Sequence, residues 1–203
     1  MMATTHALLG VLIGSAALFV APEFAPVAVA AGLVGGLFPD LDLYAGHRKT
    51  LHFPVYYSMA TVAVLAVAAL VPTAPTVALG VFLLSAAVHS VSDAFGGGLE
   101  LKPWLGESDR AVYDHFRDQW IRPRRWVRYD GAPEDFALGF FFALPSLILH
   151  EGTVQTLVVV AVLVSGVYSL FRKRLVLAAE WLVDRIPTSI LAYVPERFVR
   201  DLV

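Results

Sequence analysis

The 203-residue chain contains no cysteine and little charge. Without cysteine, disulfides, thiolate metal sites and cysteine nucleophiles are excluded. Charged residues make up 16% of the chain, against about 25% in soluble proteins. The formal net charge of -2 provides no basic surface for nucleic acid. Hydrophobic residues, by contrast, account for 58%. These values exclude an ordinary soluble domain and a disordered chain, and they predict a small membrane protein whose partner is the lipid bilayer.

Six apolar stretches are separated by shorter polar segments. A transmembrane helix needs roughly 20 apolar residues, with about 17 as the lower limit; the third, fourth and sixth stretches satisfy this, whereas the second and fifth are short. We therefore predict an all-α polytopic membrane protein with about six transmembrane helices. The stretches are Thr5–Ala21, Phe24–Phe38, Phe53–Val71, Ala74–Phe95, Phe136–Leu149 and Val154–Phe171.

The order of the charges predicts the orientation of these helices. With a cytoplasmic N-terminus, all 15 Lys and Arg residues fall on the inner side, and the three outer connections carry none. Positive charge is retained on the cytoplasmic side of a membrane. We thus predict a multi-pass protein of the inner (plasma) membrane with both termini cytoplasmic. Residues 1–171 would form the transmembrane domain, with a cytoplasmic loop inserted at 96–135, and residues 172–203 an amphipathic tail broken near Pro187 and Pro195.

Several ionisable residues lie in or beside the apolar stretches, where they are costly and therefore candidates for function. Counted from the outer turns at 1.5 Å per residue, His6, Asp40 and His89 each lie about 21–24 Å from the outer end, in a core about 30 Å thick. Three helices thus bring His or Asp to one level. His52 begins the third helix on the same side, and Asp93 shares a helical face with His89.

Such a cluster of histidines and aspartates is the ligand set of a divalent metal ion. We predict zinc, with manganese or iron as alternatives, and one or two ions. Each residue also has a structural explanation when taken alone. Asp40 and Asp42 follow a proline at a helix end, where Asp is common in turns and caps. His89 and Asp93 could form a hydrogen-bonded pair between helices. The agreement in depth across segments favours metal binding.

The ordered set of motifs resembles the YdjM-like family of LexA-regulated, inner-membrane, metal-dependent hydrolases. The elements that carry this resemblance are Thr5-His6 with Gly10, Gly35 through Asp42, His47-Arg48 through His52, and His89-Ser90 with Asp93 and Gly96–Gly98. The chain departs from the family at Thr50-Leu51-His52, because Thr and His are often adjacent in the family. The resemblance implies that His47 and Arg48 contact substrate and that the metal ligands are His6, Asp40, Asp42, His52, His89 and Asp93.

The predicted cytoplasmic loop contains four arginines interleaved with three aromatic residues between Trp120 and Tyr129. The arginines of Arg122–Arg128 could clamp a phospholipid or another phosphorylated substrate. The alternative is a positive anchor at the membrane surface, which we favour. In the same loop, His115 lies between Asp114 and Asp118 in a predicted helix.

Two classes of function fit these features. The first is a hydrolase that uses a metal-activated water on a phosphoester or acyl bond at the cytoplasmic membrane face. Asp42 or another spare carboxylate, or His47, would act as general base, and an arginine such as Arg48 would neutralise developing charge. A serine mechanism is less attractive because no Gly-x-Ser-x-Gly elbow is present. The second class is a non-catalytic metal-binding membrane protein, either a carrier, a sensor or a scaffold.

Overall fold

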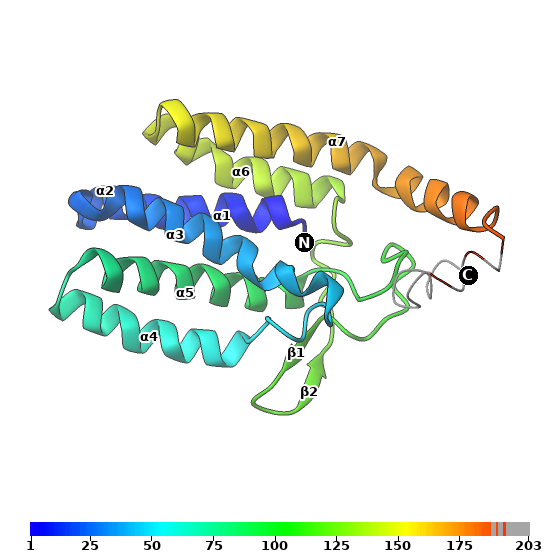
Figure 1. The fold of residues 1–203 in the computed structure, drawn as a ribbon, viewed down its shortest axis with the longest axis horizontal. Coiled ribbons are helices and arrows are strands. Elements are labelled where there is room, and N and C mark those ends of the chain that lie inside the picture. Colours follow the sequence, from blue (N-terminus) through cyan, green and yellow to red (C-terminus); the bar gives the residue numbers. More distant parts are fainter. Residues whose placement is uncertain (188–189, 191–192, 194–203) are drawn as a thin grey trace.

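A computed structural model describes residues 1–187, 190 and 193 of the chain. The predicted helical class is confirmed in its main part, because the long helices lie side by side as a bundle (Figure 1). A short antiparallel hairpin of β1 (Val112–Asp114) and β2 (Gln119–Ile121) is added at one end. The helices are α1 (Ala3–Ser15), α2 (Ala17–Val20), α3 (Ala25–Leu37), α4 (Pro54–Leu70), α5 (Ala74–Ser92), α6 (Pro133–Leu149) and α7 (Gly152–Val183).

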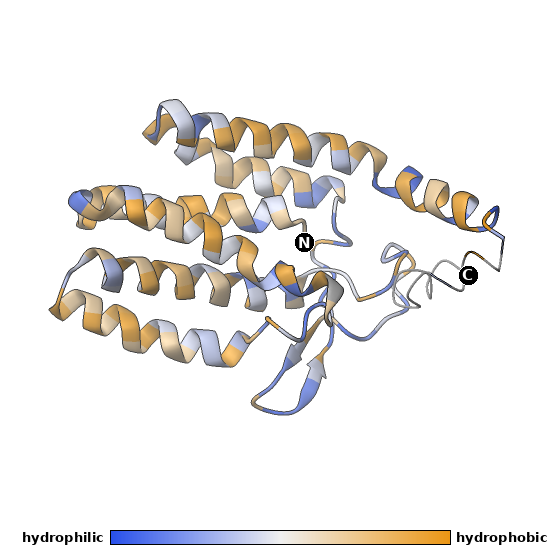
Figure 2. Ribbon diagram, in the orientation of Figure 1, coloured by the Kyte–Doolittle hydropathy of each residue, from blue (hydrophilic) through white to orange (hydrophobic). Residues whose placement is uncertain are grey.

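Four helical segments of the described residues are long and apolar enough to cross a membrane, and apolar residues dominate them in Figure 2. Helix α4 is apolar but shorter, and α6 has 17 residues. The long apolar helices fit a membrane protein, whereas six crossings and a cytoplasmic N-terminus stay predictions. The four segments are Ala3–Val20, Pro22–Leu43, Ala74–Phe95 and Gly152–Val183.

Glycines allow the helices at the centre of the bundle to touch backbone to backbone. A Cβ on Gly10 of α1 would lie 2.1 Å from the carbonyl oxygen of Gly32 on α3. One turn further along, a Cβ on Gly36 would lie 2.4 Å from the His6 carbonyl oxygen, and one on Gly35 would lie 2.3 Å from that of Phe82 on α5. These contacts hold the first half of α1 and the middle of α5 against the second half of α3.

The close backbone contact at Gly10 should make the stability of the protein sensitive to substitution at this position. We expect Gly10→Ala to destabilise the protein by about 1–3 kcal/mol, because the added methyl group overlaps a carbonyl that cannot move without shifting α3. Gly166→Ala on α7 is the matched control, since its Cβ would meet only the ring edge of Phe136 at 3.4 Å. Thermal unfolding in detergent measures both variants. Equal melting temperatures would contradict this account of the α1–α3 contact.

The segment that contains His115 is a β-hairpin, so the helix expected there is wrong. Tyr113 pairs with Trp120 across the hairpin, and His115 lies in its turn. Aromatic and β-branched side chains favour extended strands. The backbone N–H of Tyr113 donates to the Arg48 carbonyl at 2.9 Å. The hairpin therefore fixes the segment between η2 (Phe38–Tyr44) and α4, which carries several of the predicted site residues.

The last predicted span and the start of the predicted tail form one continuous helix. Helix α7 has 32 residues and passes through Arg172 without interruption to Val183. The chain leaves this helix before Pro187, where a break was expected. The predicted break near Pro195, and the amphipathic tail from residue 194 onward, lie outside the described residues.

Candidate metal centre

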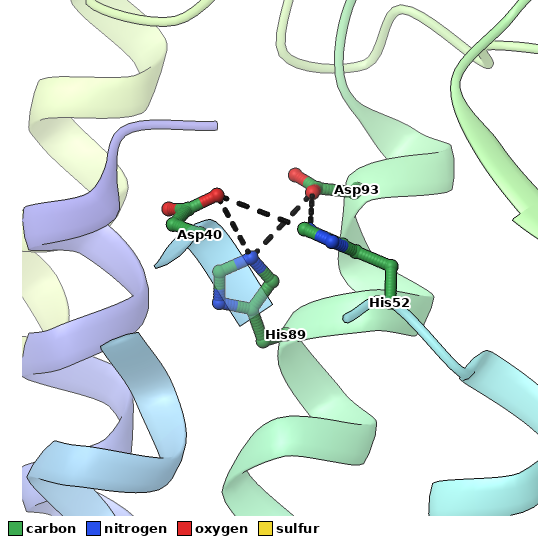
Figure 3. A group of neighbouring side chains, drawn as sticks. All are labelled: Asp40, His52, His89 and Asp93. Carbon is green, nitrogen blue, oxygen red and sulfur yellow. Dashed lines mark ion pairs between the residues drawn. The ribbon is translucent and has the colours of Figure 1, made fainter. Parts of the chain in front are cut away.

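Four of the predicted site residues converge at one end of the bundle (Figure 3). Asp40 comes from η2, His52 from the segment before α4, His89 from the last turn of α5 and Asp93 from the start of η3 (Asp93–Phe95). One ligand atom from each lies within 4.8 Å of all the others. The side chain of Asp40 is 20% exposed, and the other three are fully buried.

The spacing of these atoms matches the coordination shell of a small metal ion. His52 Nε2 lies 3.3 Å from Asp93 Oδ2 and 3.9 Å from Asp40 Oδ1. His89 Nε2 lies 3.4 Å from Asp40 Oδ1 and 3.6 Å from Asp93 Oδ2. Four ligands at about 2.0–2.1 Å from a tetrahedral zinc ion lie about 3.3–3.4 Å apart. All four donors lie within 4.8 Å of one another, so they would have to move closer together to surround one ion.

Hydrogen bonds fix which nitrogen of each imidazole faces the cluster. His89 Nδ1 donates to the Gly36 carbonyl at 2.6 Å, since a carbonyl oxygen only accepts. His52 Nδ1 donates to Asp42 Oδ2 at 3.0 Å. In neutral rings, each Nε2 then carries a lone pair. Within the described part of the chain, both of these buried Nε2 atoms lack a hydrogen-bond partner. Lone pairs that face carboxylates at this distance repel them, and either a proton or a metal cation between the atoms would remove the repulsion.

Asp42 lies next to the cluster, and both of its oxygens are already occupied. Oδ1 accepts from His47 Nδ1 at 3.1 Å and from the Arg48 N–H at 3.2 Å. Oδ2 accepts from His52 Nδ1 and from the N–H groups of Lys49 and Leu51 at 3.0–3.3 Å. Five donors fill the lone pairs of one carboxylate. Asp42 thus holds the His47–His52 segment in place and orients the His52 ring. Carboxylates that bind the second nitrogen of a metal-ligating histidine act in the same way.

The carboxylates around His52 favour positive charge at this position. Burial alone lowers the pKa of the His52 imidazole, but the hydrogen bond to Asp42 and the nearby negative charge of Asp93 together outweigh burial and raise the pKa above its ordinary value. The same negative field attracts a metal cation. In a buried site, a divalent ion compensates two carboxylates more completely than one proton does.

His6 lies against the cluster but outside the group of four. Its Nε2 is 3.2 Å from Asp93 Oδ1, the oxygen that faces away from the histidine pair, and its ring stacks on His89 with centroids 3.7 Å apart. The Met1 nitrogen lies 3.0 Å from the same oxygen. His6 is therefore placed to orient Asp93 and His89. A direct ligand role for His6 or Asp42 stays a prediction.

His47 and Arg48 line a cavity of about 740 Å³ that also reaches Asp40. Because Asp42 accepts from His47 Nδ1, the neutral ring keeps its lone pair on Nε2. Arg48 is buried; its Nη1 donates to the carbonyls of Gly97 and Ala111, and its Nε lies 3.5 Å from Asp93 Oδ2. Both side chains are thus held beside the cluster by fixed partners.

The arginines of the Arg122–Arg128 segment lie elsewhere. Arg122 pairs with exposed Asp109, and Arg128 pairs with Glu134 at the start of α6. The guanidinium of Arg125 donates to carbonyls of its own loop, and Trp126 is exposed. None of these residues lines the cavity at the cluster. This placement favours the anchor interpretation over the substrate clamp.

Sequence reasoning missed two parts of this end of the molecule. One is the Gly36 carbonyl that fixes the His89 ring; the adjacent glycines 35 and 36 were a signal that the backbone is approached closely here. The other is a polar group beyond the cluster, in which Tyr168 and Arg172 of α7 both bind Asp130. No spacing rule connects Asp130 with α7.

Comparison of the chain with protein-family models, with curated proteins and with solved structures finds no match. The likeness to YdjM-like hydrolases therefore stays a prediction from the motifs, and the function has to be argued from the site.

Proposed function

We propose that the protein is a membrane-bound, metal-dependent hydrolase whose site lies at the cytoplasmic face of an inner membrane. The observation that carries this proposal is the pair of buried, unpartnered Nε2 atoms of His52 and His89, which face the carboxylates of Asp40 and Asp93. A donor set of two nitrogens and two oxygens suits zinc best, with manganese or iron as the next choices. The described residues contain one such group, so we propose one ion.

The metal would supply two things: an activated water at neutral pH and polarisation of the bond under attack. The chain's own residues would do the rest. Gly36 and Asp42 hold the two imidazoles in the tautomer that presents Nε2. Arg48 is placed to neutralise negative charge that develops on the substrate.

His47 is the best placed general base. Its Nδ1 is held by Asp42 and the side chain borders the cavity, so its Nε2 can accept a proton from the attacking water. In many hydrolases a carboxylate binds one nitrogen of an imidazole and so points the other nitrogen toward the substrate, as Asp42 and His47 do here toward the cavity. A carrier or scaffold has no need for this second His–Asp pair.

Removal and return of metal tests the proposal. We expect detergent-purified protein to release product from a panel of phosphoester and acyl-ester amphiphiles, to lose this activity on chelation and to regain it with Zn²⁺, Mn²⁺ or Fe²⁺. Product release and metal content are measured on the same samples. Metal retention with no hydrolysis in any metal form would instead support the non-catalytic class, and protein that binds none of these ions would contradict both.

A further inference from the structure

The cavity beside the cluster extends far beyond the metal ligands. Its lining begins at Asp40, His47 and Arg48 and continues to Tyr168 and Arg172 on α7. A volume of about 740 Å³ is well above what a water molecule and a single small group need. Helices α1 and α7 both contribute to it, and Ser165 on α7 donates to Thr4 on α1 at 2.7 Å.

With the predicted orientation, the part of the cavity on α7 would lie at the depth of the inner half of a bilayer. Counted from Gly152 at 1.5 Å per residue, Val164 lies about 18 Å along the helix, Tyr168 about 24 Å and Arg172 about 30 Å. The hydrocarbon core is about 30 Å thick. The lining thus runs from acyl-chain depth at Val164 to the headgroup level at Arg172, where Asp130 fixes the guanidinium at 2.8 Å.

Several walls of the cavity are apolar, and two of these are exposed at the surface of the bundle. Leu43, the last residue of the candidate span Pro22–Leu43, is 57% exposed, and Val164 is 52% exposed. Both line the cavity, together with Leu99 and Leu101. A cavity bordered by exposed apolar residues of two candidate spans is accessible from the side, where only lipid is present in a membrane.

The other end of the cavity is suited to an anionic group. Of the Arg48 guanidinium, Nη1 donates to carbonyl oxygens, while Nη2 donates to no atom among the described residues. Asp40 faces the cavity as part of the proposed metal site, and Asp130 is neutralised by Arg172. The remaining acid, Glu100, accepts from the Glu107 N–H through Oε1, while its buried Oε2 has no partner among the described residues, so an anion is favoured at Arg48 and not beside Glu100. An arginine beside a metal cation is a recognised arrangement for phosphate.

We propose that this cavity binds a phosphate-bearing lipid that enters sideways from the bilayer, with acyl chain along Leu43 and Val164 and phosphate at Arg48 and the metal cluster. This inference rests on the proposed function and names its substrate class. Acyl-chain burial would supply most of the affinity, and the headgroup contacts would place the scissile bond at the cluster.

Lipid binding can be measured without turnover, by native mass spectrometry of the detergent-purified full chain. The probes are phosphatidic acid, diacylglycerol with the same chains, and glycerol 3-phosphate. We expect phosphatidic acid to be retained above the other two. We expect Val164→Trp, which fills the apolar end, to bind phosphatidic acid about tenfold more weakly. Val167→Trp is the matched control, because Val167 is 58% exposed on the same helix but does not line the cavity.

Each other outcome overturns a defined part of the proposal. Unchanged binding in Val164→Trp, or an equal loss in Val167→Trp, would remove the cavity as the lipid site. Equal retention of diacylglycerol would remove phosphate recognition, and equally tight binding of glycerol 3-phosphate would show that the ligand is a soluble phosphate ester. Metal content is measured in parallel. Specific lipid binding by protein that takes up no metal would contradict the proposed hydrolase but keep the lipid site. Metal uptake without specific lipid binding would keep the proposed metal site but contradict the lipid site.

Discussion

Asp40→Asn is expected to reduce the metal content of the purified protein from about one ion per chain to below about 0.1. The amide keeps the size of the side chain but removes the negative charge and turns one donor atom into an N–H group. Asp40 suits this test because its side chain is 20% exposed and has few other partners. Asp93 is less suitable because it also contacts His6 and Arg48. Metal content by elemental mass spectrometry measures the effect.

Asp109→Asn is the control for this experiment. Asp109 is exposed and contacts Arg122 in the same loop region, away from the cluster. We expect the Asp109→Asn protein to keep the full metal content. His89→Ala should lose metal as Asp40→Asn does, because it removes one of the two free Nε2 atoms. Asp40→Asn protein that melts like wild type and still carries its metal would show that the four residues are not the site.

The positions of the long helices follow from hydropathy. Each of the six apolar stretches is helical, although the first is divided into α1 and α2, and the ends differ by only a few residues except in α7. The depth count also places His6, Asp40 and His89 together, because a helix converts sequence distance into height with little freedom. The hairpin escaped prediction, since three-residue strands such as Val112–Asp114 give no usable periodicity and depend on contacts such as the one with Arg48.

Which residues of the cluster face the proposed metal, and which only support it, depends on individual hydrogen bonds that the spacing of residues in the sequence does not determine. Asp40 and Asp42 are two residues apart, yet one faces the proposed metal and the other is saturated by five donors. The difference arises in the turn at Gly46 and Arg48, both of which have positive φ. In that turn, the inserted Leu51 donates its N–H to Asp42. His52 therefore reaches the cluster although it is separated from Thr50.

His47→Gln is expected to lower kcat by about 10²–10⁴-fold, the usual contribution of a general base, with metal content unchanged. Glutamine can still donate to Asp42 and fill the space, but it has no ring nitrogen that accepts a proton. His115→Gln is the matched control. His115 is another half-buried histidine near this end of the bundle; it contacts the Lys49 carbonyl and does not line the cavity. We expect its kcat to match wild type.

The division between kcat and KM decides what His47 does. A general base acts only as the water attacks, so its loss should lower kcat and leave KM nearly constant. A residue that only binds the substrate would raise KM with little change in kcat. If His47→Gln loses metal as well, His47 supports the cluster through Asp42, since the two share a hydrogen bond next to His52. Full activity in His47→Gln would show that His47 is not the general base and would exclude the mechanism proposed for this residue.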